Sequence, residues 1–315
     1  MVKTYHELRQ KNKPMVYIII VNWNGLDDTL ECLESLEKIN YPSYKIIVVD
    51  NGSKNNQADA IKEKFSGVEL IKNETNEGFV IANNQGIKLA LEGGAQYLLL
   101  LNNDTTVKND FLINLIKYAE QNNTVGILSP KILYYNSDTI WSMGGRINCL
   151  AGFAILIGKK KHREKYKTII EPDYVTGCAM LIKREVIKKI GLLDPVYFAY
   201  YEDGDFSFRA KKAGYNIRVI PESIIWHKKS ASAGIRGSKR KISGLQAYLW
   251  ARNGVIFGKK NLVGWKKFSF IFGHFSFNFI YHLLGNFNIK FILYYIKGLY
   301  HGVIISCDNL WTKKK

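Results

Sequence analysis

The chain has 315 residues, which is enough for one large domain or two ordinary ones. Hydrophobic residues make up 47% of the sequence and charged residues 23%, so a disordered or collagen-like chain is excluded. The formal net charge is +18, and the stretch from Lys228 to the end holds 16 basic residues against one acidic residue. That excess indicates an anionic partner: nucleic acid, a phosphate-bearing ligand or an acidic membrane.

The cysteines and the N-terminus bear on where the protein resides. The four cysteines lie far apart and form no metal-binding spacing with histidine, so we expect neither a disulfide framework nor a zinc site. Residues 1–14 are polar and contain no apolar core of a secretory signal. We therefore expect a cytoplasmic protein.

The first hundred residues alternate short apolar runs with helical patterns, which predict strands and helices respectively. The predicted strands are Met15–Val21, Lys45–Asp50, Val68–Ile71 and Gln96–Leu101. The predicted helices between them are Leu26–Ile39, Asn55–Phe65 and Ala82–Leu91. Strands without polar alternation, separated by helices, predict a Rossmann-like, mostly parallel sheet flanked by helices.

The rest of the chain is less regular, and its composition changes after His227. Residues 136–172 predict irregular loops or short hairpins. The other expected elements are a helix at Phe111–Gln121, a strand at Val125–Tyr134 that ends or breaks at Pro130, a strand at Tyr174–Ile182, a helix at Glu185–Ile190, a helix at Asp203–Ala213 and a strand at Asn216–Ile220. We place a boundary near residue 230, with a catalytic or binding domain over residues 1–230 and a basic, aromatic-rich helical region over residues 231–315.

Polar residues follow three of the predicted strands, where an open parallel sheet binds its ligands. The three segments are Asn22-Trp23-Asn24-Gly25, Asp50-Asn51-Gly52-Ser53 and Asn102-Asn103-Asp104. Turns and helix caps explain any one of them, but three on one rim favour a ligand site. Asp50 suits a base or ribose, and Asp104 suits a divalent cation. The chain has neither G-x-G-x-x-G nor G-x-x-x-x-G-K-[ST], which disfavours a dehydrogenase or a P-loop enzyme.

A second acidic cluster lies at Tyr201-Glu202-Asp203-Gly204-Asp205, after several aromatic residues. Three carboxylates so close together raise the pKa of at least one of them. They form either an acidic first turn of the following helix or a site with a general base.

In these motifs the chain resembles the inverting nucleotide-sugar glycosyltransferases of family two, which have the GT-A fold, and above all their rhamnosyltransferase-like branch. The resemblance covers residues 15–230, about two thirds of the chain. The matching segments, in order, are 21–25, 48–53, 76–79, 101–105, 176–180, 200–206, Gly214-Tyr215, Pro221 and His227.

The resemblance implies a donor site. Asp50 would bind the nucleoside, with Asn22 and Asn24 lining the same pocket. Asn76, Glu77 and Gly78 would shape the donor pocket or merely form the turn before a helix. The segment Asn102-Asn103-Asp104 stands where the family has D-x-D, with only its last position acidic. Asp104 would therefore link a Mg²⁺ or Mn²⁺ ion to the diphosphate.

The resemblance also implies the chemistry. Glu202-Asp203 matches the family's acidic catalytic motif, and we assign the base to Asp203, in a single displacement that inverts the anomeric centre. His227 is either a second metal ligand or a structural histidine. Arg252 and Asn253, in a later predicted helix, contact phosphate or lie on a solvated helix face.

The tail contains 22 residues without Lys, Arg, Asp or Glu, at Phe268–Ile289, a length that could span a bilayer. Seven of these residues are polar, which argues against a helix surrounded by lipid. Phe and Tyr beside lysines suit the headgroup region of an anionic membrane. We expect the tail to lie on the inner face of the cell membrane; the alternative is an apolar subdomain that packs on the core or on a second subunit in a homodimer.

The main functional hypothesis is transfer of a sugar such as rhamnose from a nucleoside diphosphate to a hydroxyl of a polyprenyl-linked or other cell-envelope glycan. A nucleotidyltransferase on a similar fold is an alternative, disfavoured by the Glu202-Asp203 motif and by the lack of a glycine-rich basic loop after the first strand. A basic nucleic-acid-binding protein is another, but no recognised module is present, so we expect no nucleic-acid partner.

Overall fold

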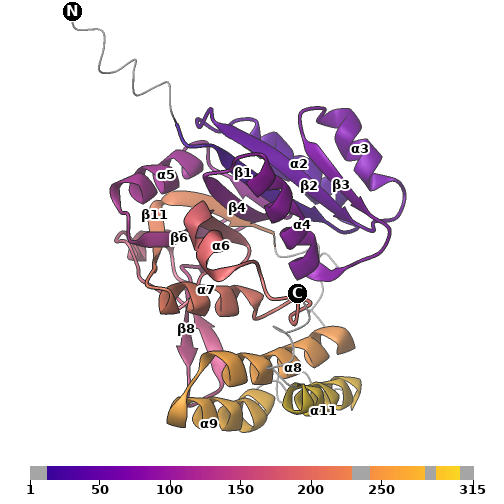
Figure 1. Cartoon of the computed structure of the whole chain (residues 1–315), viewed down its shortest axis with the longest axis vertical. Coiled ribbons are helices and arrows are strands. Elements are labelled where there is room, and N and C mark those ends of the chain that lie inside the picture. The colour runs from indigo at the N-terminus through magenta and orange to yellow at the C-terminus, as the bar shows by residue number, and fades with distance from the viewer. Residues whose placement is uncertain (1–12, 229–241, 281–288, 306–315) are drawn as a thin grey trace, which may run out of the picture.

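Residues 13–228, 242–280 and 289–305 are described by a computed structural model of the chain. They form an α/β body with a group of C-terminal helices packed beside it (Figure 1). The boundary predicted near residue 230 lies outside the described residues.

Within the described residues, nine strands form the central sheet, in the order β3-β2-β1-β4-β10-β6-β11-β5 with β7 beside β6. Strands β1 to β4 pair in parallel, and β6 and β11 run in the same direction, whereas β10 and β5 are antiparallel to their neighbours. The sheet strands are β1 (Val16–Asn22), β2 (Tyr44–Asn51), β3 (Glu69–Asn73), β4 (Tyr97–Asn102), β5 (Thr105–Val107), β6 (Val125–Tyr134), β7 (Ile140–Ser142), β10 (Ala179–Lys183) and β11 (Asn216–His227).

Helices cover both faces of this sheet, which explains why its strands are apolar throughout. Along β1, Ile18 and Ile20 join the core beneath α2, α3 and α5, while Tyr17 and Ile19 join the core beneath α4, α6 and α7. The predicted mostly parallel sheet is confirmed. The helices of this domain are α2 (Leu26–Leu36), α3 (Gln57–Lys64), α4 (Gly78–Glu92), α5 (Phe111–Gln121), α6 (Arg184–Ile190) and α7 (Glu202–Lys212).

The last strand of the domain is longer than the sequence pattern predicts. The prediction ended it at Ile220, but β11 continues through a register shift between Ile220 and Ile224 and reaches His227. The shift lies opposite Pro130, which has no N–H to donate and does not end β6 as one prediction had it. This continuation aligns His227 with Thr105 on β5, one residue after Asp104.

The predicted hairpin region contains a two-stranded sheet of β8 (Gly145–Asn148) and β9 (Phe153–Leu156). Its tip lies against the C-terminal helices with almost no space between the backbones. A Cβ on Gly152 would be 2.0 Å from the backbone nitrogen of His274. The Ser269 hydroxyl donates to the carbonyl of Cys149 over 2.7 Å.

Among the described residues, the C-terminal region contains α8 (Gly244–Asn261), α9 (Gly264–Gly273), the π-helical segment His274–Asn278 and α11 (Ile289–Ile304). Helix α11 lies along α8, with Gly298 and Gly302 against the backbone of Tyr248 and Arg252. None of the helices in the described ranges has both the length and the hydropathy needed to cross a bilayer. Part of the uncharged stretch Phe268–Ile289, residues 281–288, lies outside the described residues.

Candidate active site

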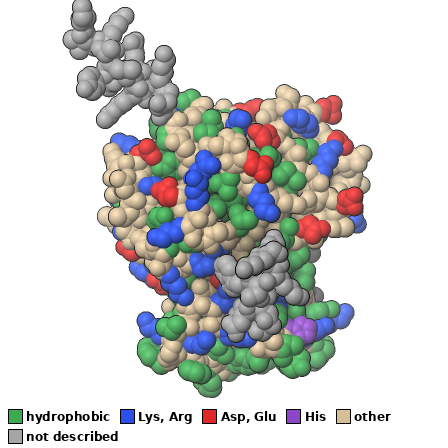
Figure 2. All heavy atoms as spheres, viewed as in Figure 1, with side chains coloured by type: hydrophobic (Ala, Val, Ile, Leu, Met, Phe, Trp, Pro, Cys, Tyr) green, Lys and Arg blue, Asp and Glu red, His purple; other side chains and the backbone are tan. Residues whose placement is uncertain are grey.

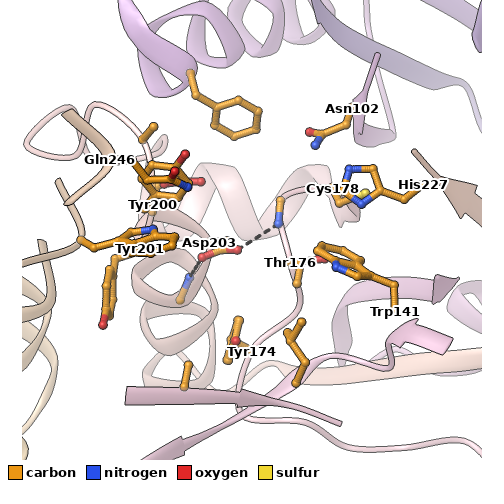
Figure 3. A pocket seen from close by; sticks show the side chains of 18 of the residues that line it. Asn102, Trp141, Tyr174, Thr176, Cys178, Tyr200, Tyr201, Asp203, His227 and Gln246 are labelled. Carbon is orange, nitrogen blue, oxygen red and sulfur yellow. Dashed lines mark hydrogen bonds between the residues drawn. The ribbon is translucent and has the colours of Figure 1, made fainter. Parts of the chain in front are cut away.

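A cavity of about 550 Å³ lies where the sheet, the hairpin β8–β9, α7 and α8 meet. Six of the residues selected from sequence line it: Asn102, Asn103, Asp104, Glu202, Asp203 and His227. Figure 3 shows Asn102 and His227 on one side, Tyr200, Tyr201 and Gln246 on the other, and Asp203 between them. Segments more than a hundred residues apart in sequence thus share one pocket.

Asp104 and His227 face each other at the sheet edge because β5 and β11 are paired there. The Nε2 atom of His227 is 3.1 Å from Oδ1 of Asp104, and both side chains are buried. The edge of the Trp141 ring packs on the imidazole, with centroids 4.5 Å apart. Within the described part of the chain, the buried Nδ1 of His227 has no hydrogen-bond partner.

A chain of hydrogen bonds connects the pocket to the carboxyl ends of β1 and β2. The Asn103 amide donates to the Thr29 hydroxyl over 2.9 Å, and that hydroxyl donates to Oδ1 of Asn22 over 2.8 Å. Asn22 in turn donates to Oδ1 of Asp50 over 2.6 Å. Thr29 was not among the predicted site residues, although its place in the first turn after Asn22-Trp23-Asn24-Gly25 was a usable signal.

The other predicted donor residues lie along the same edge but do not line the cavity. Asn24 is exposed with a left-handed φ of 53°, and its side-chain oxygen accepts from the backbone of Lys54. The side-chain oxygen of Asn76 accepts from Gly78 N, and Gly78 has φ +87°. A Cβ on Gly78 would be 2.5 Å from the Phe198 ring, so glycine is required there. Asn22, Asn24, Asp50, Asn76 and Gly78 are therefore neighbours of the pocket.

The three carboxylates of the second cluster have three different environments. Asp203, in the first turn of α7, is half-buried and accepts hydrogen bonds from Gly177 N at 3.1 Å and Gly204 N at 2.7 Å, as Figure 3 shows. Burial raises the pKa of its carboxyl group, while these two N–H donors act in the opposite direction by stabilising the carboxylate. Asp203 therefore faces the pocket as an ionisable group with its orientation fixed.

Glu202 is buried, and its Oε2 atom has no hydrogen-bond partner in the described structure. Burial, followed by the charge of Asp203, raises the pKa of Glu202 well above its ordinary value. A carboxyl group in that environment holds its proton more strongly than an ordinary glutamate does.

Asp205 points away from the pocket into a polar cluster with α8. It accepts from Arg209 Nε over 2.8 Å, from Lys260 Nζ over 3.0 Å and from the Asn261 amide over 2.8 Å. Burial alone would raise its pKa, but the charges of Arg209 and Lys260 outweigh burial and hold its pKa below the ordinary value. Asp205 thus joins α7 to α8.

Other lining residues had no role assigned to them from the sequence, although Thr176 lies in the matching segment 176–180. Trp141 comes from β7, Tyr174 and Thr176 come from the segment before β10, and Gln246 and Trp250 come from α8. Both predicted roles of Asn253 are wrong, since it is fully buried and bonded to backbone carbonyls, so it neither contacts a ligand nor lies on a solvated face. Through Gln246 and Trp250, the tail nevertheless contributes directly to the walls of the pocket.

The donor set at the sheet edge fits a divalent ion that shares its shell with a phosphate ligand. The described residues contain no group of three or more His, Cys, Asp and Glu suited to a metal. Asp104 and His227 provide one carboxylate and one imidazole close together, and Mg²⁺ or Mn²⁺ accepts phosphate and water oxygens in the other positions.

The fold agrees with that of known glycosyltransferases. The structure of GalNAc-T7 with UDP, GalNAc and Mn²⁺ superposes with a TM-score of 0.59 at 19% identity, over 87% of this chain and 58% of the other. The curled α/β sheet with helices on both faces is the GT-A fold, as predicted.

The sequence comparisons identify the family. The model of glycosyl transferase family 2 matches residues 17–191, and the chain belongs to that family. The chain is 26% identical to the dTDP-rhamnosyl transferase RfbF of Shigella flexneri over 79% of its length and 81% of the relative's. It is 28% identical to the rhamnosyltransferase WbbL of Escherichia coli (strain K12), over 66% of this chain and 81% of the relative. The predicted similarity to the rhamnosyltransferase-like branch is confirmed.

Proposed function

We propose that this glycosyltransferase moves rhamnose or a similar sugar from a nucleoside diphosphate to a hydroxyl group, with inversion at the anomeric carbon. The observation that carries the proposal is the position of the Asp203 carboxylate. It is fixed by two backbone N–H groups in the same pocket as Asp104 and His227. Membership of family 2 favours glycosyl transfer over the nucleotidyl transfer and nucleic-acid binding that composition left open.

The donor's nucleoside would lie over β1 and β2. Asp50 is buried with its Oδ2 atom accepting from Ser53 N, and a buried carboxylate at this edge suits the N–H or ribose hydroxyl of a nucleoside. The hydrogen-bonded chain from Asp50 through Asn22 and Thr29 to Asn103 would align nucleoside and diphosphate subsites. RfbF is described as a dTDP-rhamnosyl transferase, which makes dTDP-rhamnose the first donor to test.

The diphosphate would lie near Asp104 and His227, which would hold a divalent ion. The structure of GalNAc-T7 contains Mn²⁺ together with UDP, which supports this placement by analogy of fold. When bound, such an ion stabilises negative charge on the leaving diphosphate. Three of the five buried side-chain polar atoms that lack a partner among the described residues line this pocket, on Thr176, Glu202 and His227. Buried polar atoms are rarely unpaired, so this concentration favours a polar ligand.

Asp203 would act as the general base. It accepts the proton of the acceptor hydroxyl while that oxygen bonds to the anomeric carbon and the bond from this carbon to the diphosphate oxygen breaks. One displacement leaves the opposite configuration at that carbon. Glu202 would remain protonated beside it, so that the pair carries one negative charge and Asp203 carries it.

The C-terminal helices would hold the enzyme at the inner face of an anionic membrane. Large apolar side chains are exposed on α9 and α11, including Trp265, Phe268, Phe272, Leu293 and Tyr300. Lys266, Lys290 and Lys297 are exposed on the same two helices, and Figure 2 shows hydrophobic and basic side chains side by side at this end of the molecule.

Not all of the tail's basic residues are available to a membrane. Lys260 pairs with Asp194 and Asp205, and Lys228 pairs with Asp28 and Glu31. The mixture of exposed aromatics and lysines that remains is typical of an interfacial helix, and it would place the pocket near a polyprenyl-linked or other cell-envelope acceptor.

Thermal unfolding with nucleotide sugars tests the donor proposal. We expect dTDP-rhamnose with Mg²⁺ or Mn²⁺ to raise the melting temperature more than UDP-N-acetylglucosamine or either metal alone, since ligand binding to the folded state stabilises it. Release of dTDP from dTDP-rhamnose then tests turnover, with water in place of the acceptor. The proposed function would be contradicted if neither donor raised the melting temperature and neither donor released its nucleotide.

A further inference from the structure

We infer that Asn253, in the C-terminal helix α8, is a positioning residue that fixes the turn carrying Asp203. The inference rests on the proposed role of Asp203 as the base. It concerns a different part of the chain, because Asn253 lies in α8 of the C-terminal region, whereas Asp203 lies in α7.

The turn before α7 has an unfavourable backbone conformation. Tyr200 and Tyr201 are consecutive residues in the left-handed region, with φ of 70° and 72°. Residues with a Cβ rarely adopt this region, and such conformations persist where surrounding contacts impose them. The carbonyl of Tyr201 accepts from Asp205 N over 2.9 Å, so this turn sets the start of α7 and hence the direction of Asp203.

Asn253 supplies contacts that impose the turn. Its side chain is fully buried, and its amide nitrogen donates to the carbonyls of Ala199 and Tyr200, each over 2.8 Å. A primary amide has two hydrogens, and both are used on two successive backbone carbonyls. The opposite end of the amide is also fixed, since its oxygen accepts from Arg252 Nε over 2.8 Å. Arg252 donates in addition to the carbonyl of Val196.

Helix α8 is held in place by contacts with two other helices, α11 and α7. On its far side, a Cβ on Gly298 of α11 would be 2.3 Å from the carbonyl oxygen of Tyr248, so the two helices are in direct backbone contact. About two turns beyond Asn253, the helix also contacts α7, through Lys260 and Asn261 on Asp205. The two contacts differ, because Asn253 holds the loop before Asp203, whereas Asn261 holds a carboxylate that Arg209 also holds.

That difference provides a matched control on the same helix. Asn253→Ala removes both bonds to the turn, and Asn261→Ala removes one buried amide bond to α7 while leaving the turn in place. Both variants lose buried hydrogen bonds, so both lower the melting temperature. The positioning role predicts that only Asn253→Ala impairs the chemical step.

The experiment measures dTDP release from dTDP-rhamnose by the full chain and by Asn253→Ala, Asn261→Ala and Asp203→Asn. We expect Asn253→Ala to lower kcat by about 10- to 100-fold, because a small displacement of a catalytic group is that costly. Its KM for dTDP-rhamnose should stay within about threefold of wild type, as expected when ground-state binding is intact. Asn261→Ala should keep kcat within about threefold.

A second variant, Arg252→Ala, keeps the inference testable if Asn253→Ala does not fold. Arg252 is partly exposed, and Arg252→Ala removes the bond that orients the amide, the bond to Val196 and the contact with the Tyr248 ring. Both bonds of the Asn253 amide to the turn remain possible, so we expect a roughly 3- to 10-fold loss of kcat with KM retained. The inference would be overturned if Asn253→Ala and Arg252→Ala both kept the wild-type kcat, or if Asn261→Ala lost as much kcat as Asn253→Ala. Normal turnover by Asp203→Asn would instead overturn the proposed function, so the two failures are distinguishable.

Discussion

The backbone N–H of Gly177 donates to Oδ2 of Asp203 over 3.1 Å and thereby connects the loop before β10 to the first turn of α7. The second oxygen of the same carboxylate accepts from Gly204 N. With both oxygens held by backbone donors, the carboxylate has little rotational freedom and keeps its negative charge better than burial alone would allow.

Asp203→Asn retains the shape of the side chain and one of its two backbone hydrogen bonds, because an amide nitrogen cannot accept from an N–H, and it cannot act as a base. We expect kcat to fall by about 10²- to 10⁴-fold, the usual contribution of a general base. Thermal stabilisation by dTDP with Mn²⁺ should remain, since the proposed nucleotide subsite lies over β1 and β2. A variant that turns over at the wild-type rate would show that Asp203 is not the base.

Glu202→Gln mimics the protonated form of this carboxyl, which burial favours. We expect kcat within about tenfold of wild type, because the variant keeps the neutral form that burial favours and leaves Asp203 as the base. The kcat/KM of both proteins should rise with pH through the pKa of Asp203, which burial raises above the ordinary aspartate value, since only the deprotonated base is active. If Glu202→Gln were as inactive as Asp203→Asn, the division of roles between the two acids would be wrong.

Asp205→Asn removes the carboxylate partner of Arg209 and one of the two carboxylates that contact Lys260. We expect the free energy of unfolding to fall by about 3 kcal/mol, because Arg209 loses its charged partner, whereas Lys260 keeps Asp194. The pKa of Asp205 is lowered in the folded state, so its contribution is present above the pKa of the unfolded carboxyl and is lost as pH falls through the folded pKa. Urea unfolding at pH 7 and at pH 3 should therefore show a smaller difference between variant and wild type at pH 3.

His227→Ala and Asp104→Asn test the metal subsite. In each variant we expect dTDP to stabilise the protein equally with and without Mn²⁺, whereas the wild type should gain further stability from the ion. His162→Ala is the control, since that histidine is exposed and lies outside the pocket lining. Retention of the Mn²⁺-dependent gain in His227→Ala would assign that histidine a structural role.

Phe268 and Phe272 are 75% and 68% exposed on α9, which makes them suitable probes of membrane contact. The double variant Phe268→Asp, Phe272→Asp should bind vesicles containing phosphatidylglycerol at least tenfold more weakly, because apolar insertion is lost and negative charge is added. Ile169→Asp changes an exposed apolar residue of the catalytic domain and should bind as wild type does. Equal binding by all three proteins would favour a protein partner or a second subunit for this surface.

The sheet and the polar rim could be predicted because their signals are local in sequence. The apolar runs of β1, β2 and β4 lead directly into Asn22, Asp50 and Asn102, so parallel pairing brings those strand ends to one edge. The role of α8 had no such signal. Asn253 acts on Ala199 across more than fifty residues, and a polar side chain in a basic helix favours a solvated position until the fold buries it.

The acidic cluster shows the same limit. Glu202, Asp203 and Asp205 lie within four consecutive positions of the sequence. The rotation of the helix nevertheless directs Asp205 to Arg209 and Lys260 and leaves Asp203 in the pocket. Arg209 could have been found from its i, i+4 spacing to Asp205. Lys260 could not, since its approach depends on where α8 packs.

The contact between the hairpin and α9 restricts how this enzyme can change in evolution. Gly152 and Gly273 meet so closely that a Cβ on Gly273 would be 2.1 Å from the carbonyl oxygen of Leu150. Neither segment can be replaced by one from a relative unless its counterpart is replaced as well. Chimeras that exchange tails between family members should therefore be cut so that residues 145–156 and the C-terminal helices come from the same parent.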